Sequence, residues 1–256
     1  MLVSIVIPSF QQAFLLERAL KSIESQLFTD YEILVMDGGS KDDTATVVAR
    51  FSHLPLSFYS EKDAGIYDAM NKGVKQSKGD YIYFMGCDDR LASPDTLQKV
   101  FSVKNITDNH VIYGNVLFPE SGQVYYGEFT YYKLYIYNIS HQAIFTRREV
   151  FDKLGLFNLR YKAFADYEFN MRWFDAPDIK RKYVPITVAI YETTGFSSQY
   201  HDIDFAADQW QLKKKYFPKI VRYLAVRQDK FAYKAIAKLL TDKRIVALNF
   251  MRDWLE

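Results

Sequence analysis

The chain has 256 residues, of which 49% are hydrophobic and 17% aromatic, so it is a globular protein with a large core rather than a disordered or fibrous one. Its net charge of +2 conceals an acidic first half, with 11 Lys and Arg against 17 Asp and Glu in residues 1–128, and a basic tail, with 12 against 4 in residues 213–256. The single cysteine excludes an internal disulfide, and no Cys/His spacing typical of a zinc site is present, so we expect a reducing compartment. We find no signal peptide and no apolar run of about 18 residues, and therefore expect a cytoplasmic protein.

Short apolar runs alternate with segments of helical period through the first 105 residues. The runs predict strands at 2–8, 31–37, 56–60 and 81–85, each followed by a helix. This alternation is typical of an α/β fold with a mostly parallel, Rossmann-like sheet and helices on both of its faces.

The helix expected from Ile66 has a distinct apolar face. Ala69, Met70 and Val74 share that face with Ile66. Four side chains are therefore expected to point elsewhere: Tyr67, Asp68, Asn71 and Lys72.

The strand at residues 81–85 is followed by two adjacent carboxylates, Asp88 and Asp89. In open α/β sheets, ligands bind just beyond the carboxyl ends of the strands, where these two side chains would lie. Paired carboxylates are costly unless something positive neutralises them, and a divalent cation with oxygen ligands does so. The alternative is that one of them merely caps the next helix.

Other carboxylates are expected near the same edge of the sheet, namely Asp37, Asp68 and, much later in the chain, Asp166. Such a cluster suits a substrate with a pyrophosphate. A divalent metal on the pyrophosphate would stabilise the charge that develops as the bond to this leaving group breaks.

The alternation loosens after residue 105. Strands are expected at 110–118, 123–129, 140–145 and 184–191, and a helix at 165–173. The aromatic stretch 131–137 either contacts substrate or belongs to the core, and we favour the core. Residues 193–198 are expected to form a mobile loop.

The basic tail is expected to be helical, with Lys and Arg interleaved with apolar side chains. Residues 213–256 either lie on an anionic membrane surface or pack against the domain. We expect no nucleic-acid partner, because the positive charge is confined to the tail and no recognition motif accompanies it.

Five groups of residues follow one another over roughly residues 3–200: Ser4–Phe10, Met36–Thr44, Asp63–Gly73, Gly86–Asp89, and His141 and Gln142 with Ala165–Glu168 and Arg172. Together they resemble the motifs of family 2 glycosyltransferases, particularly the bacterial enzymes that build O-antigen, capsule and exopolysaccharide. The resemblance implies a GT-A fold over residues 1–204, with a nucleotide-binding half (1–105) and an acceptor-binding half (106–204). Residues 205–256 are then a basic helical extension that the resemblance does not cover.

The resemblance also implies roles for residues of the nucleotide-binding half. Pro8 and Phe10 would line the pocket for the base, Asp37 would bind the base or ribose, and Asp68 with Lys72 would help to hold the donor.

Asp88 and Asp89 match the acidic metal-binding motif of the family. Asp89 would bind Mn²⁺ or Mg²⁺, and Asp88 would contact the donor. Cys87 stands where the motif usually begins with an acidic residue, which leaves open how many side chains contact the metal.

Asp166 matches the base that deprotonates the acceptor hydroxyl. Ala165 replaces the first residue of the usual Glu-Asp pair, so Glu168 stays an alternative base, and a charge at a helix N-terminus is an alternative role for Asp166. His141 would contact donor or acceptor, or be a core histidine. Arg172 would pair with the diphosphate or with Glu168, one helical turn earlier.

The resulting functional prediction is an inverting, metal-dependent glycosyltransferase with a nucleotide-sugar donor, preferentially a UDP-sugar. Its acceptor would be a lipid-linked or growing polysaccharide in bacterial surface polysaccharide synthesis, such as lipopolysaccharide or capsule. The protein would be cytoplasmic and peripheral at the inner face of the cytoplasmic membrane.

Two alternatives remain open at this point. One is a sugar nucleotidyltransferase, although that activity favours a Gly-rich, Arg-containing loop where this chain has Ser-Phe-Gln-Gln at 9–12. The other is a non-catalytic binding subunit of a polysaccharide assembly complex. A dinucleotide-binding dehydrogenase is weaker, because no G-x-G-x-x-G motif follows the first strand.

Overall fold

A computed structural model of the chain describes residues 1–125, 127–191 and 200–227. The predicted loop at 193–198 and the part of the tail after residue 227 lie outside the described residues.

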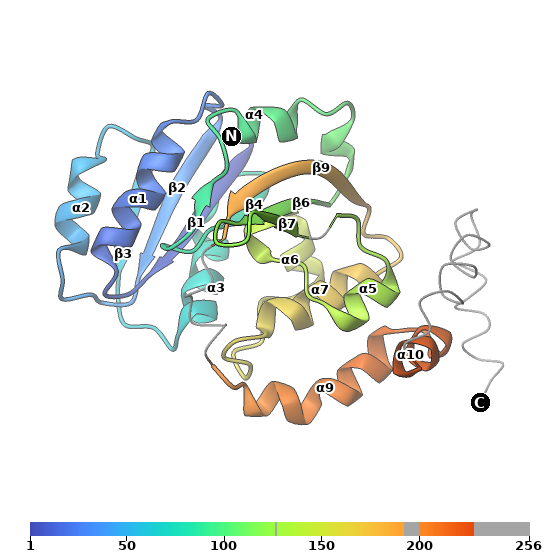
Figure 1. Cartoon of the computed structure of the whole chain (residues 1–256). Coiled ribbons are helices and arrows are strands. Elements are labelled where there is room, and N and C mark those ends of the chain that lie inside the picture. The colour runs from blue at the N-terminus through green and yellow to red at the C-terminus, as the bar shows by residue number, and fades with distance from the viewer. Residues whose placement is uncertain (126, 192–199, 228–256) are drawn as a thin grey trace.

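The first half is the predicted succession of parallel strands and helices (Figure 1). The strands lie in the order β3-β2-β1-β4, and all three neighbouring pairs are parallel. Their carboxyl ends therefore meet at one edge, where Ser9 is paired with Asp37. The elements are β1 (Val3–Ser9), α1 (Ala13–Glu24), β2 (Tyr31–Asp37), α2 (Thr44–Arg50), β3 (Leu56–Ser60), α3 (Ile66–Gln76) and β4 (Tyr81–Phe84).

The second half continues the same sheet in the order β4-β8-β6-β9-β5. β8 is antiparallel to both of its neighbours, whereas β6 and β9 are parallel, so this half is mixed. The strands are β5 (Arg90–Leu91), β6 (Val111–Phe118), β7 (Gln123–Tyr125), β8 (Ile144–Arg147) and β9 (Arg181–Ile190). The helices are α4 (Thr96–Phe101), η1 (Ile106–Asp108), α5 (Tyr131–Ile136), η2 (His141–Ala143), α6 (Arg148–Leu154) and α7 (Ala165–Asp175).

Each face of the sheet is covered by its own apolar core. On β1, Val3, Ile5 and Ile7 pack on the face that carries α1, α2 and α4. Val6, between them, packs on the opposite face with α3, α5, α6 and α7. Alternate side chains of a strand point to opposite faces, so a strand whose every residue is buried lies inside a sheet with two covers. The predicted α/β fold is confirmed.

Residues 131–145 carry two predictions, an aromatic core segment at 131–137 and a strand at 140–145. Residues 131–136 of the aromatic stretch form α5, and the core interpretation is confirmed for its buried residues Tyr132, Leu134 and Tyr135, whereas Ile136 and Tyr137 are exposed. The strand expected at 140–145 is wrong in its first part, because His141–Ala143 form a short 3₁₀ helix and β8 begins only at Ile144.

The described part of the tail packs against the domain. α9 (Ile203–Tyr216) lies against α7, and α10 (Lys219–Val226) lies against α5 (Figure 1). Phe217 stacks edge-on against Tyr135 at 5.3 Å, and the ammonium group of Lys213 lies 4.4 Å from the same ring. Residues 213–227 therefore pack against the domain, and the outward side of α9 is exposed. Within the described residues, no helix combines the length and hydropathy that crossing a membrane requires.

Candidate active site

The carboxyl ends of β1 and β2 and the turn after β4 are joined by hydrogen bonds. The backbone N–H of Gly38 donates to the carbonyl of Ser9 at 2.8 Å, and the Cys87 thiol donates to the carbonyl of Pro8 at 3.1 Å. The strand ends that carry Asp37, Asp88 and Asp89 therefore lie around Pro8, as the sequence predicted.

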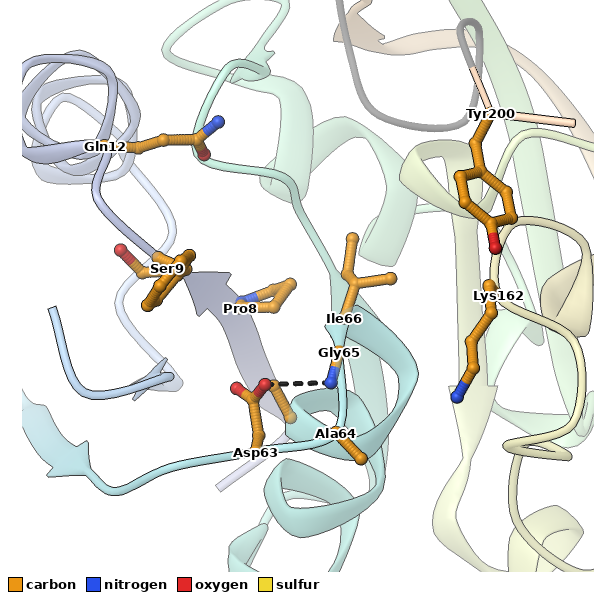
Figure 2. A pocket seen from close by; sticks show the side chains of 11 residues that line it. Pro8, Ser9, Gln12, Asp63, Ala64, Gly65, Ile66, Lys162 and Tyr200 are labelled. Atoms are coloured by element: carbon orange, nitrogen blue, oxygen red, sulfur yellow. Dashed lines mark hydrogen bonds between the residues drawn. The ribbon is translucent and has the colours of Figure 1, made fainter.

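A cavity of about 500 Å³ opens at this edge (Figure 2). Pro8 and Phe10, predicted to line the base pocket, both border it, and Phe10 is 59% exposed. Ile66 of α3 forms part of the wall, and Lys162 and Tyr200 face it from the second half of the chain. The cavity thus lies between the two halves of the chain, where a ligand would contact both.

Asp37 is not among the side chains that line this cavity. It is 3% exposed and accepts hydrogen bonds from the backbone N–H groups of Gly39 and Ser40 and from the hydroxyls of Ser40 and Ser60. Oδ2 accepts three of these hydrogen bonds and Oδ1 accepts one, so most of the acceptor capacity of the carboxylate is used within the turn. In this structure Asp37 holds the turn after β2, and its contact with a base or ribose stays a prediction.

Asp63 is the carboxylate that does line the cavity, and the sequence analysis assigned it no role. Gly38 makes room for it, because a Cβ atom on Gly38 would lie 2.9 Å from Asp63 Oδ2 and 3.1 Å from Phe10. Asp63 Oδ1 accepts the N–H of Gly65 at 2.9 Å (Figure 2). Asp63 begins the motif Asp63–Gly73, but no local pattern places its side chain in the cavity, because that position depends on the loop from β3 folding over β2.

Asp68 and Lys72 of α3 stabilise the loop between β3 and α3. Asp68 Oδ2 accepts the N–H of Ala64 at 3.0 Å, and Lys72 lies 2.9 Å from Glu61 and 3.6 Å from Asp68. The hydrogen bond to Glu61 raises the pKa of Lys72. Neither Asp68 nor Lys72 borders the cavity, so their direct contact with a donor stays a prediction.

The turn after β4 folds two carboxylates over Gly86. A Cβ atom on Gly86 would lie 2.6 Å from Asp88 Oδ1 and 2.7 Å from Asp89 Oδ2, so only glycine fits there without displacing them. Asp89 is 1% exposed; its Oδ2 accepts the N–H of Gly86 at 3.2 Å, and no hydrogen bond of normal geometry reaches its Oδ1, although the side chain of Gln142 lies close enough to lower the pKa of Asp89. Burial, and then the charge of Asp88, raise the pKa of Asp89 to about 7.

An unpartnered, buried carboxylate oxygen fits a hard divalent cation, which would replace the missing hydrogen bond and the missing charge compensation. Within the described ranges, no three His, Cys, Asp or Glu side chains lie close enough together to hold a metal ion. Asp89, with Asp88 beside it, would therefore hold Mg²⁺ or Mn²⁺ together with oxygens of a bound phosphate, as Mg²⁺ sites commonly do. Cys87 does not fit as a ligand, because its thiol donates to the carbonyl of Pro8 and a hard divalent cation prefers oxygen ligands; burial also raises the pKa of this thiol to about 12.

Asp166 is held at the start of α7, 7% exposed. Its Oδ1 accepts the Tyr67 hydroxyl at 2.9 Å and the backbone N–H of Tyr167 at 2.8 Å. Its Oδ2 accepts an N–H of Asn138 at 2.9 Å and lies 3.4 Å from His141 Nδ1. The carboxylate is thus fixed by α3, by its own helix and by the segment before β8.

His141 links Asp166 to the metal-binding candidates. Burial lowers its pKa, but the hydrogen bond and charge of Asp166 and the charges of Asp89 and Asp88 outweigh burial, so the net direction is upward. His141 therefore contacts Asp166 and lies within electrostatic range of Asp89 and Asp88. The grouping of Asp88, Asp89, His141 and Asp166 in one donor site stays a prediction.

Arg172 pairs with Glu168, which confirms the second of its two predicted roles. Its Nη2 lies 2.9 Å from Glu168 Oε2, and its guanidinium donates to the carbonyls of Leu154, the last residue of α6, and of Leu156. Burial raises the pKa of Glu168, and the charge of Arg172 opposes that shift. Because Glu168 is already part of a buried ion pair with Arg172, Asp166 is the better candidate for the base.

Tyr67 and Asn138 are site residues that the sequence analysis missed. Helical period placed Tyr67 off the apolar face of α3, yet it is 5% exposed because the chain around Ala163 covers it, and its hydroxyl lies 2.9 Å from the carbonyl of that residue. This is a correction to the predicted orientation, and Asn71 is buried for a similar reason, its amide bonding the backbone of Phe157.

Comparison with known proteins shows which protein family this chain matches. A model of "Glycosyl transferase family 2" matches residues 4–171. A "PGL/p-HBAD biosynthesis glycosyltransferase" of Mycobacterium bovis is 36% identical over 208 residues, which is 79% of this chain and 81% of that protein. A "GalNAc(5)-diNAcBac-PP-undecaprenol beta-1,3-glucosyltransferase" of Campylobacter jejuni is 33% identical over 125 residues, 47% of this chain and 40% of that one.

Two solved structures share the fold. S. aureus TarS in complex with UDP-GlcNAc superimposes with a TM-score of 0.71 and 18% identity, over 84% of this chain and 66% of that chain. The mannosyltransferase PcManGT of Pyrobaculum calidifontis, in complex with GDP-Man and Mn²⁺, gives a TM-score of 0.62 and 16% identity, over 99% and 84%. At these identities the likeness concerns the fold alone.

Proposed function

The chain belongs to glycosyl transferase family 2, and from this premise we propose that it is an inverting, metal-dependent enzyme using a nucleotide-sugar donor, preferentially a UDP-sugar. The acceptor is a lipid-linked molecule or a growing polysaccharide in bacterial surface polysaccharide synthesis. The observation that carries the proposal is that two buried carboxylates lie within electrostatic range of His141: Asp89, whose Oδ1 lacks a hydrogen bond, and Asp166, which lies 3.4 Å from the imidazole.

The reaction proposed for this site is a direct displacement. The acceptor hydroxyl oxygen attacks the anomeric carbon, the bond from that carbon to the diphosphate breaks, and the hydroxyl proton moves to Asp166. Asp166 can take that proton through Oδ2, because Oδ1 already accepts two hydrogen bonds. A divalent cation at Asp89 would supply positive charge to the departing nucleoside diphosphate.

The cavity beside this site is proposed to hold the nucleoside part of the donor. Pro8, Phe10 and Ile66 offer an apolar surface for a flat base, and Asp63 offers an acceptor for an N–H of the base or a ribose hydroxyl. Lys162 supplies a positive charge from the opposite wall, which suits an anionic ligand.

The nature of the acceptor is proposed from the relatives. The C. jejuni relative is named for a substrate on undecaprenol diphosphate, which is a lipid-linked sugar acceptor. The M. bovis relative is named for PGL/p-HBAD biosynthesis. Both names support glycosyl transfer in glycoconjugate assembly over the nucleotidyltransferase and binding-subunit alternatives.

A thermal-shift screen of nucleotide sugars with and without Mn²⁺ tests the donor and metal assignments. A ligand that binds only the folded state, at 100 times its dissociation constant, adds about 2.7 kcal/mol to the free energy of unfolding and raises the melting temperature by about 5–10 °C. We expect such a rise for one nucleotide sugar only when Mn²⁺ or Mg²⁺ is present. An equal rise with EDTA would contradict the metal assignment, and no rise for any nucleotide sugar would contradict the donor assignment.

The outer surface of α9 is proposed to contact an anionic membrane. Ile203 and Trp210 are 74% and 55% exposed on this helix, and the exposed Lys214 lies on the same face by helical period. Basic residues near an anionic bilayer contribute about 1 kcal/mol each. Replacing Lys214 by alanine should therefore weaken binding to phosphatidylglycerol vesicles roughly fivefold in sedimentation assays. Equal binding of the wild-type protein to neutral and anionic vesicles would contradict this surface assignment.

A further inference from the structure

A line of buried polar side chains ends at Asp166. Asp166, Asn170 and Trp173 lie four and three residues apart on α7 and so share one face of this helix. Trp173 is 0% exposed and Asn170 is 2% exposed. The facing segment, residues 138–139, lies between α5 and η2.

The indole of Trp173 fixes the direction of every hydrogen bond in this line. Its Nε1 donates to Asn170 Oδ1 at 2.8 Å, and an indole N–H can only donate, so the amide oxygen of Asn170 must face Trp173. The NH₂ group of Asn170 then points away and donates to Asn138 Oδ1 at 2.8 Å and to the carbonyl of Ile139 at 2.9 Å. Asn138 is turned in the same way, and its NH₂ group faces Asp166 Oδ2 at 2.9 Å.

We propose that Trp173, Asn170 and Asn138 form a polarised relay that keeps an N–H, and never a carbonyl oxygen, directed at Oδ2 of Asp166. The inference rests on the proposed function, in which Oδ2 takes the proton of the acceptor hydroxyl. The three relay members are positioning residues, since none of them borders the cavity.

The relay matters because the two oxygens of Asp166 are held differently. Oδ1 accepts the Tyr67 hydroxyl and the N–H of Tyr167, so it is fixed by two donors. Oδ2 has Asn138 as its close donor, with His141 Nδ1 at 3.4 Å. The orientation of the Asn138 amide therefore decides whether the reacting oxygen is stabilised by an N–H or repelled by a carbonyl oxygen.

The substitution Asn170→Asp reverses the relay with little change in shape. The new carboxylate still accepts the indole N–H, but it presents an oxygen to Asn138, which must turn its NH₂ group toward residue 170 and its carbonyl oxygen toward Asp166. Release of nucleoside diphosphate from the nucleotide sugar found in the thermal-shift screen gives kcat and KM. We expect kcat to fall roughly tenfold or more, a part of the effect of a general base, with KM unchanged.

Two further variants complete the experiment. Asn115→Asp is the matched control, because Asn115 is also buried but bonds the Tyr183 hydroxyl on β9, which can donate to a carboxylate instead. It should keep the wild-type kcat. Asn138→Leu removes the N–H from Asp166 at a position that is only partly buried, and should lower kcat without raising KM.

The outcomes separate the relay from the function on which it rests. A folded Asn170→Asp or Asn138→Leu variant with wild-type kcat would overturn the relay, and Asn138→Leu decides alone if Asn170→Asp does not fold. A loss in Asn115→Asp equal to that in Asn170→Asp would also overturn it, because any buried carboxylate would then have the same effect. Should Asp166→Asn lose activity while both relay variants keep it, the proposed function stands and the relay fails. A wild-type protein that releases no nucleoside diphosphate refutes both.

Discussion

Replacing Asp166 with asparagine should abolish sugar transfer while leaving donor binding intact. Asparagine keeps an oxygen for the Tyr67 hydroxyl and the Tyr167 N–H but cannot accept the proton of the acceptor, and general-base catalysis typically contributes 10²–10⁴-fold, so we expect roughly that loss in kcat. Its NH₂ group would also face the NH₂ group of Asn138, which costs about 1–3 kcal/mol of stability. Steady-state kinetics with calorimetric measurement of donor affinity provides the test.

Glu168→Gln is the matched control for this prediction. It removes a carboxylate two residues further along α7, one that is paired with Arg172 instead of facing His141. We expect a less stable protein whose turnover per folded molecule is unchanged. Wild-type turnover in Asp166→Asn together with lost turnover in Glu168→Gln would transfer the role of base to Glu168.

Replacing Asp89 with asparagine should have two opposite effects. The substitution should abolish the rise in melting temperature that Mn²⁺ and the nucleotide sugar produce together, because the neutral amide of asparagine is a weak ligand for a hard divalent cation. It should also stabilise the metal-free protein at high pH, because the charged form of Asp89 is buried without a full set of partners.

The sign of the second effect follows from the direction of the pKa shift. The pKa of Asp89 is raised from 3.8 to about 7 in the folded protein, so the folded state binds this proton more tightly than the unfolded chain does. As pH rises from about 4 to about 7, ionisation of Asp89 therefore lowers the free energy of unfolding progressively. Above pH 7 the loss is complete and is on the order of 4 kcal/mol. The variant should melt higher than wild type at pH 8 in EDTA, and the difference should vanish near pH 4. Equal melting temperatures at pH 8 would show that Asp89 carries no such cost.

The nucleotide-binding half could be predicted closely because its signals are local. Continuous apolar runs gave β1 to β4 and the helices between them, and the position of Asp89 just after such a run placed it at the edge of the sheet. The antiparallel pairing of β8 with β4 and β6 could not be predicted in this way, because it depends on contacts across the whole second half.

The site was predictable where a residue type follows a strand or begins a helix, and not where distant segments cover it. Asp166 was identified from its motif, whereas its partner Tyr67 lies 99 residues earlier and was expected to point away from the core. Asp63 enters the cavity because Gly38 leaves space for it, which depends on the packing of one loop against another. Such contacts are set by tertiary structure, and no periodicity in the chain encodes them.

The most direct test of the account is a crystal structure with UDP and Mn²⁺, with the metal located from its anomalous scattering. The account predicts one manganese peak at the Asp89 carboxylate, bridging to the diphosphate, with the base in the cavity formed by Pro8, Phe10 and Asp63. A peak elsewhere, or a nucleotide that binds away from His141 and Asp166, would contradict it.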